Sequence, residues 1–161
     1  MLAASAYEIV LAVHIMAVVV AFGVTFAYPI MFVVAARSDP RGLPLMHRVE
    51  YTIERFLINP GLLVVLAAGI FLASDGHHWS RFFVQWGLGV VIVIGALVGS
   101  VMIPTAKRAE AAAIRDTKLI GSPGEVTLSA EYRALARRLG VVGSALSLLV
   151  LVTIALMVIK P

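Results

Sequence analysis

Four long stretches of the chain are almost continuously apolar and carry almost no charge. They cover Ile9–Ala36, Phe56–Ala73, Phe82–Ile103 and Leu139–Ile159. Each reaches or nearly reaches the roughly 20 residues that cross a hydrocarbon layer about 30 Å thick. Because lipid offers the backbone no hydrogen-bond partner, each stretch must form a helix. The pattern predicts an all-α membrane protein in which residues 1–161 form a single four-transmembrane-helix bundle, with spans at about 7–36, 54–73, 82–103 and 139–159.

The composition agrees with a membrane protein and removes several functional classes. Apolar residues make up 61% of the chain and charged residues 14%, whereas soluble domains have about 45–50% and about 25%. The absence of cysteine excludes disulfides, thiolate metal sites and cysteine nucleophiles. The chain also lacks the Ser–His–Asp, GxxxxGK[ST], GxGxxG and HExxH patterns of soluble hydrolases, nucleotide-binding proteins and metalloproteases. Catalytic residues are therefore not assigned from the sequence.

Basic residues are concentrated in two of the three connections between the spans. Among the lysines and arginines, only Arg81 and Lys160 lie outside the first and third connections. Eleven of the thirteen lysines and arginines lie in the first and third connections: Arg37, Arg41, Arg48, Arg55, Lys107, Arg108, Arg115, Lys118, Arg133, Arg137 and Arg138. This bias predicts that both connections are cytoplasmic and that both termini lie outside the plasma (inner) membrane. The net charge of +4 then serves orientation and contact with anionic lipid head groups, and we expect no nucleic-acid partner.

The connections themselves carry helix signals. Leu45–Arg55 favours a helix that runs into the second span, with Glu54 at the interface, where a long side chain can reach water. In the third connection, Thr105–Lys118 is rich in helix formers, and Ser129 is typical of an N-cap that begins the last helix. Gly121–Gly124 favours a turn between them. We therefore expect a helical cytoplasmic loop, and we interpret it as a solvated connector rather than a docking site.

Small residues are spaced so that helices can approach closely. Pairs four residues apart are Gly95 with Gly99, Gly140 with Ser144, and Gly143 with Ser147. Such pairs favour helix packing within a membrane. The interpretation is a compact bundle in which these residues line contacts between helices.

Few polar residues lie within the apolar stretches, and His14 is the main one. Ala21, Thr25 and Tyr28 share its helix face, which must point into the bundle, and Gln85 lies at a similar depth in the third span. Three roles for His14 remain open: a hydrogen-bonded structural histidine, a metal or heme ligand, and a proton relay. His77 and His78 lie in the outer loop. Two interpretations of them remain open: additional metal ligands or ordinary surface residues.

Two segments resemble the copper-resistance-D-like superfamily of small membrane proteins. Leu11–Phe32, with L-x-x-H-I, Phe22-Gly23 and Tyr28-Pro29, resembles its first span, and Glu50–Gly69, with Asn59-Pro60-Gly61, is similar to its second. That group includes the four-helix membrane protoporphyrinogen oxidase of heme biosynthesis. Over its whole length the chain resembles a bacterial four-helix integral-membrane family of the same superfamily. The resemblance implies a heme or porphyrin context, with His14 at the position of the first-span histidine. The third span departs from the oxidase pattern, because no histidine or lysine enters it. Its polar residues at that end are Arg81 and Gln85.

From these observations we expect a small membrane protein associated with heme or copper. His14, Tyr28 and Gln85 would bind the cofactor in an outer-leaflet polar pocket, and His14, His77 and His78 would be the metal ligands. The alternative is a non-catalytic accessory or assembly subunit that docks on a larger membrane complex through its Gly/Ser faces and the helical third connection. The candidate partners are such a membrane protein or a second copy of this chain. A transporter or proton-coupled carrier ranks third: the spans contain few charges, so an oligomer would have to supply the pathway.

Overall fold

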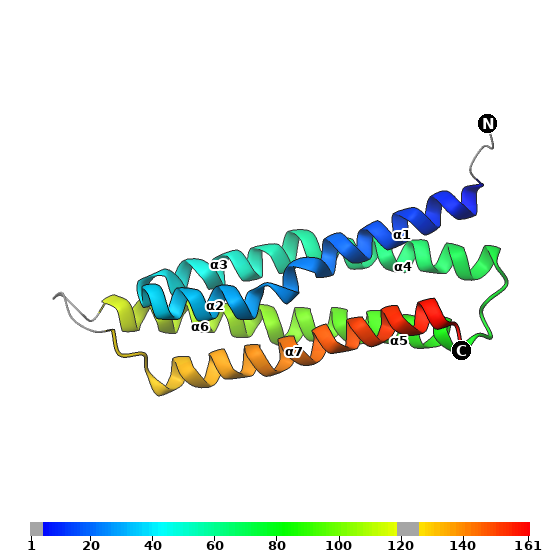
Figure 1. Cartoon of the computed structure of the whole chain (residues 1–161). Helices are drawn as coiled ribbons and strands as arrows, with labels where there is room; N and C mark the ends of the chain where they lie inside the picture. Colours follow the sequence, from blue (N-terminus) through cyan, green and yellow to red (C-terminus); the bar gives the residue numbers. More distant parts are fainter. Residues whose placement is uncertain (1–4, 119–125) are drawn as a thin grey trace.

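Four long helices lie side by side and form one elongated bundle (Figure 1). The computed structural model describes residues 5–118 and 126–161, and over these ranges the chain forms helices and loops without a strand. The segments of the long helices are, in chain order, α1 Ala6–Gly23, η1 Val24–Phe26, α2 Tyr28–Ser38, η2 Pro40–Gly42, α3 Leu43–Ile53, η3 Glu54–Ile58, α4 Asn59–Asp75, α5 Phe82–Leu97, η4 Val98–Met102, α6 Ile103–Lys118 and α7 Ala130–Ile159. The predicted all-α fold with four candidate membrane spans is confirmed.

The long helices exceed the thickness of a membrane. They contain 33, 36, 37 and 30 residues, which correspond to about 45–55 Å of helix against a hydrocarbon layer of about 30 Å. The additional turns lie at one end, where α3, α6 and the first turns of α7 carry most of the charged residues (Figure 1). We call this the basic end. The side of the membrane that it faces remains a prediction from the charge distribution.

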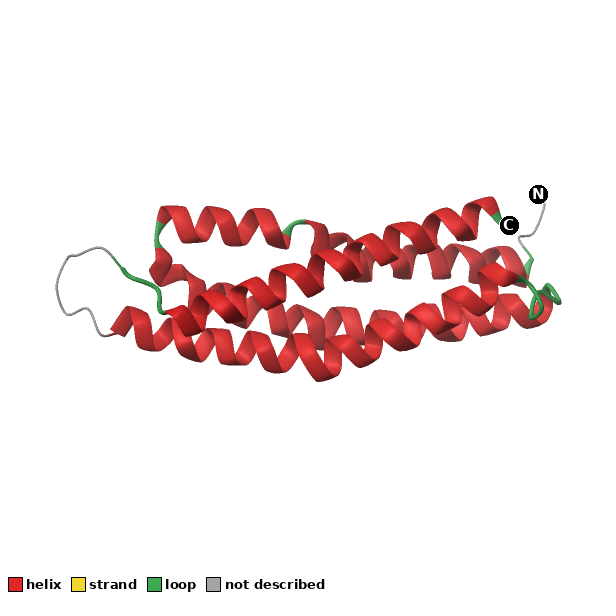
Figure 2. Ribbon diagram, turned by 90° about the horizontal axis from the view of Figure 1, so that it is seen from below, coloured by secondary structure: helices red, strands yellow, loops and turns green. Residues whose placement is uncertain are grey.

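Three of the four long helices depart from α geometry, and each does so shortly before a proline. The 3-10 turn η1 precedes Pro29, and the π-helical turns η3 and η4 precede Pro60 and Pro104. Proline lacks an N–H, and its ring collides with the carbonyl four residues earlier, so the preceding turn must loosen. The loop residue after η1 is drawn green within the first long helix in Figure 2. By contrast, α7 contains no proline and continues for 30 residues.

The apolar part of the bundle has its own core, and a glycine allows two helices to approach closely beside it. The core residues are Ala21, Phe22, Ile58, Leu62, Val90, Ile94, Val98 and Val150. A Cβ on Gly61 would lie 2.6 Å from Cβ of Ala21, which is far inside van der Waals contact. Glycine at position 61 therefore lets α1 and α4 approach closely.

A second core lies in the basic end, so the third connection is more than a solvated connector. One face of α6 consists of Ala106, Ala109, Ala112 and Ala113, each 0% exposed. These alanines pack with Leu43, Tyr132 and Leu139 from α3 and α7. The interpretation as a solvated connector is wrong: the four-helix bundle continues past the apolar stretches, and alanine permits close packing there.

Polar contacts fasten the helices at the basic end. Nη2 of Arg48 lies 2.8 Å from Oε1 of Glu110, joining α3 to α6. The hydrogen bond and charge of Glu110 raise the pKa of the Arg48 guanidinium above its usual value. The predicted N-cap Ser129 is confirmed, because its hydroxyl accepts a hydrogen bond from the backbone N–H of Tyr132 at 3.1 Å. The predicted turn at Gly121–Gly124 lies outside the described residues.

The small-residue pairs are only partly used in packing. A Cβ on Gly95 would lie 3.0 Å from Leu62, and one on Gly143 would lie 3.7 Å from Met102. Gly99 and Gly140 face open space, with nothing within 4 Å of an added Cβ. The interpretation of Gly99 as a helix-contact residue is therefore wrong: it lies within the π-helical turn η4, on an exposed face.

Candidate functional site

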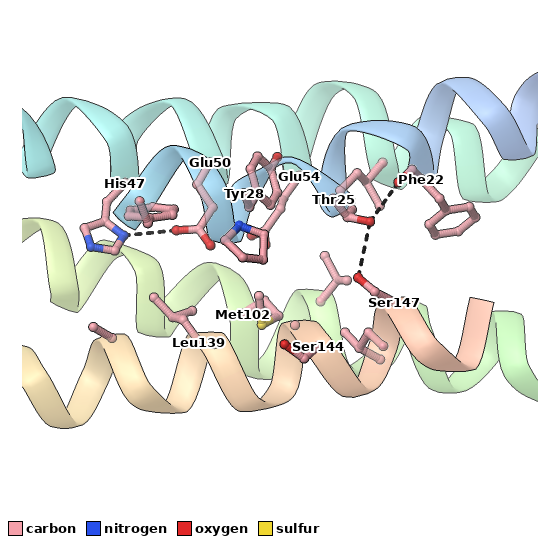
Figure 3. Close-up of a pocket in the computed structure, with 18 of the residues that line it drawn as sticks. Phe22, Thr25, Tyr28, His47, Glu50, Glu54, Met102, Leu139, Ser144 and Ser147 are labelled. Atoms are coloured by element: carbon pink, nitrogen blue, oxygen red, sulfur yellow. Dashed lines mark hydrogen bonds and ion pairs between the residues drawn. The ribbon is translucent and has the colours of Figure 1, made fainter. Parts of the chain in front are cut away.

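A cavity of about 320 Å³ lies where the apolar part of the bundle meets the basic end (Figure 3). All four long helices contribute to its walls. Most of the lining is apolar, including Phe22, Ile94 and Val150 at the membrane side. The polar lining residues are Thr25, Tyr28, His47, Glu50, Glu54, Tyr132, Ser144 and Ser147. The cavity is therefore amphipathic along the bundle axis.

At the basic end of the cavity, a histidine joins two other buried polar side chains. Nδ1 of His47 lies 3.0 Å from Oε2 of Glu50, and Nε2 lies 3.1 Å from the hydroxyl of Tyr132. All three side chains are buried. Their spacing follows from helix geometry, because positions 47 and 50 are one turn apart on α3. Tyr132 is brought in from α7, which the Ser129 cap begins one turn earlier.

Tyr132 takes part in these hydrogen bonds in its protonated form. Burial, together with the negative charges of Glu50 and Asp116, raises the pKa of Tyr132 to about 12. Tyr132 lies outside the apolar stretch of α7 and stays protonated at neutral pH. Its hydroxyl lies within hydrogen-bond distance of Nε2 of His47, and Oε2 of Glu50 lies within hydrogen-bond distance of Nδ1. Every polar atom of the ring is thereby satisfied.

Beyond this network, two polar groups of the cavity have no protein partner. Glu54 is 2% exposed, and its Oε2 is buried without a hydrogen-bond partner, as is the hydroxyl of Tyr28. The expectation that Glu54 reaches water at the interface is wrong. The face of Glu54 continues that of Glu50, toward the bundle axis, while the neighbouring Arg55 is exposed. In Figure 3 the Tyr28 and Glu54 side chains lie next to each other at the cavity.

The irregular turns of the helices coincide with the cavity wall. Glu54 and Ile58 are the first and last residues of η3, and Val98 and Met102 are those of η4. All four line the cavity. A π-helical turn changes the direction in which the neighbouring side chains leave the helix, and such turns occur frequently at functional sites. The prolines that follow these turns thus shape the cavity.

The cavity opens between α2 and α7. Val33 and Ala36 on α2, and Gly140 and Ser144 on α7, line it while remaining exposed. Over this stretch α2 packs mainly against α3, and the residues of α7 are small. Across the opening, Oγ of Ser147 donates to the Thr25 hydroxyl over 3.5 Å at the membrane-side end. Since most of this stretch lies within the apolar segments, the opening faces the lipid.

His14 lies outside this cavity and contacts α4. A Cβ on Gly69 would lie 3.4 Å from Cε1 and 3.8 Å from Nδ1 of the His14 ring. Nδ1 of the ring is buried without a hydrogen-bond partner among the described residues. Glycine at position 69 therefore leaves room for the imidazole between α1 and α4. The His14 ring therefore packs against α4.

The other predicted site residues lie apart from one another. Gln85 is exposed and donates to the backbone oxygen of Trp79 over 3.4 Å. Nδ1 of His77 lies 3.1 Å from the Asp75 carbonyl oxygen, and His78 packs on Phe83 with ring centroids 6.0 Å apart. Within residues 5–118 and 126–161, no group of three or more His, Asp or Glu side chains is arranged to hold a metal ion. Of the predicted cofactor residues, only Tyr28 lines the cavity.

Sequence reasoning missed His47 and Tyr132 and gave Glu54 a different role. One signal could have found part of the site: His47, Glu50 and Glu54 follow at intervals of three and four residues, which places them on one helix face. Tyr132 carries no comparable signal, because it lies 85 residues from His47.

The fold and the cavity define a polytopic integral membrane protein with four spans. Residues 8–161 match the family described as Predicted integral membrane protein (DUF2269), and the chain belongs to that family. No curated protein and no solved structure matches the chain significantly.

Proposed function

We propose that this protein binds a small amphipathic molecule that enters the cavity from the bilayer. One observation carries the proposal: Oε2 of Glu54 and the Tyr28 hydroxyl are buried without protein partners at the wall of a largely apolar cavity. Buried polar groups are nearly always hydrogen-bonded. The polar head of a ligand would provide the missing partners.

The charge of the cavity favours a ligand whose head is a cation or a strong hydrogen-bond donor. Glu50 and Glu54 both line the cavity, and no lysine or arginine is among its lining residues. Carboxyl oxygens accept hydrogen bonds, and a bound cation would favour the ionised form of Glu54, so the site favours donors. Because Glu50 is already bound to His47, Glu54 is the group available to the ligand. A protonated amine supplies both charge and donors.

The remaining walls favour a hydrocarbon body. Phe22, Ile94 and Val150 surround the membrane-side end of the cavity, away from the carboxyl groups. A volume of about 320 Å³ is at the lower end of the roughly 300–1,000 Å³ found for small-molecule sites. The opening between α2 and α7 would admit such a molecule directly from the lipid. The proposed ligand class is therefore a lipophilic amine.

Three compounds with the same chain and different heads test this proposal. Octylamine, octanol and octanoate are added separately to the purified protein in neutral detergent, and thermal unfolding is followed. Octylamine should raise Tm most, octanol less, and octanoate should have no effect. The Glu54→Gln variant should lose the response to octylamine. Asp75→Asn, which removes an exposed carboxylate at the opposite end of the bundle, should retain it.

Two results would contradict the proposal. Equal shifts from the three compounds would show that the chain inserts without recognition of its head. An unchanged octylamine response in Glu54→Gln would show that the amine binds elsewhere.

The heme or copper association predicted at His14 is a separate proposal. The buried, unpartnered Nδ1 of His14 favours it. The surroundings do not fit a heme, because the Gly69 backbone lies against the ring and His14 does not line the cavity. Absorbance and metal analysis of the purified protein are decisive: the proposal requires a Soret band or bound copper that His14→Ala abolishes.

A role as an accessory or assembly subunit also remains a proposal. The exposed apolar side chains of the four spans suit lipid as well as a neighbouring membrane protein. Affinity purification from mild detergent tests it, since a stable subunit should bring defined partners in fixed stoichiometry.

A further inference from the structure

A second cavity lies at the basic end, and arginines from two elements far apart in the sequence line it. Its volume is about 750 Å³. Arg37 lies in the last turn of α2, Arg41 lies in η2, and Arg133 lies near the start of α7. The hydroxyls of Ser38 and Thr127 add neutral donors to the same lining.

Little negative charge within the described residues balances these arginines. None of the three forms an ion pair there, whereas Arg48 and Arg115 of the same end are paired with Glu110 and Glu131. Asp39 also lines the cavity. Its Oδ1 accepts the backbone N–H of Arg41 at 3.0 Å and caps the turn η2. The charge of the lining is therefore positive.

Along the bundle axis, the cavity lies at the level expected for the lipid head groups. Arg37 directly follows the apolar stretch that ends at Ala36, and Arg133 precedes the apolar stretch from Leu139 by six residues, or about 9 Å of helix. The head-group layer on each side of the hydrocarbon is about 5–8 Å thick. Long arginine side chains can span the difference.

We propose that this cavity binds the phosphate of an anionic phospholipid. Guanidinium groups bind phosphate through paired, charge-assisted hydrogen bonds, and several converging arginines are a typical arrangement for that ligand. Ala36 lines both cavities. A phosphate held by the three arginines would therefore place its acyl chains along the opening between α2 and α7. This lipid site is distinct from the carboxyl-lined cavity and does not depend on the amine proposal.

Matched triple variants separate a specific site from general attraction. The site variant combines Arg37→Gln, Arg41→Gln and Arg133→Gln. The control variant removes the same charge from Arg108, Arg137 and Arg138, which are exposed at the basic end but do not line the cavity. Each protein is purified in neutral detergent, and binding of a short-chain phosphatidylglycerol is measured by native mass spectrometry and thermal unfolding. Short-chain phosphatidylcholine and inorganic phosphate are measured in parallel.

The wild type and the control variant should bind phosphatidylglycerol with similar affinity. The site variant should bind it at least about tenfold more weakly, since the loss of one charge-assisted contact already has about that effect. Equal weakening in both triple variants would overturn the proposal in favour of non-specific attraction. A full response to inorganic phosphate would also overturn it, by reassigning the site to a soluble anion. Equal binding of phosphatidylcholine would remove the requirement for an anionic lipid.

Discussion

Glu50 and Glu54 lie one helical turn apart on the same buried face, yet only Glu50 has a side-chain partner. Glu50 accepts a hydrogen bond from His47, while Oε2 of Glu54 is buried without one. Glu50 thus supports the ring of His47, which contacts Tyr132 of α7, whereas Glu54 leaves an open acceptor in a cavity. The first arrangement stabilises the bundle, and the second is suited to a ligand.

The hydrogen bond between His47 and Tyr132 should stabilise the basic end. Tyr132→Phe removes the hydroxyl and leaves Nε2 of the buried His47 ring without a partner. Leaving a buried polar group unsatisfied costs about 1–3 kcal/mol, so the free energy of unfolding in detergent should fall by that amount. Tyr7→Phe is the control, because the Tyr7 hydroxyl makes no side-chain hydrogen bond within the described residues. Equal stability of the two variants would mean that the buried network contributes nothing.

Glycine positions in the bundle should differ sharply in their tolerance of a methyl group. Gly61→Ala would place a Cβ 2.6 Å from that of Ala21 and force α1 and α4 apart. Overpacking of this kind typically costs about 1–3 kcal/mol. Gly99→Ala meets nothing within 4 Å and should leave stability unchanged or raise it by up to about 1 kcal/mol through helix propensity. Thermal unfolding of both variants in detergent measures the difference, and a reversed order would contradict the helix faces described above.

The orientation predicted from charge can be tested with single cysteines, since the chain has none. Ser74 is exposed beside the loop between α4 and α5, and Ser38 is exposed at the basic end. Ser74→Cys should react with a membrane-impermeant thiol reagent applied to intact cells, and Ser38→Cys should react only after the membrane is opened. Labelling in the opposite order would place the basic end outside.

The helices could be predicted because, in lipid, every apolar stretch must satisfy its backbone hydrogen bonds internally. The cavity could not be predicted from the sequence. Beyond Glu54 the wall depends on the π-helical turn before Pro60, because a regular 3.6-residue period places the following side chains on another face. Tyr132 reaches His47 only because α6 packs on α3 and α7, which the spacing of either residue does not reveal. For the same reason, a similar depth grouped Gln85 with His14, whereas the structure brings Gly69 of α4 to the His14 ring.

Replacement of the two glutamates should change the stability of the ligand-free protein in opposite directions. Glu50→Gln removes the charge that accepts the hydrogen bond of His47 and should lower the free energy of unfolding by about 1–3 kcal/mol. Glu54→Gln removes a carboxyl group whose Oε2 has no partner and replaces it with an uncharged amide that is less costly to bury. Residues held ready for a ligand often reduce stability in its absence, so this variant should unfold at a higher temperature than the wild type. Thermal unfolding of the three proteins in the same detergent, without added ligand, measures both effects. If Glu54→Gln instead destabilises as much as Glu50→Gln, the Glu54 carboxyl is a structural group, and the assignment of its open acceptor to a ligand is wrong.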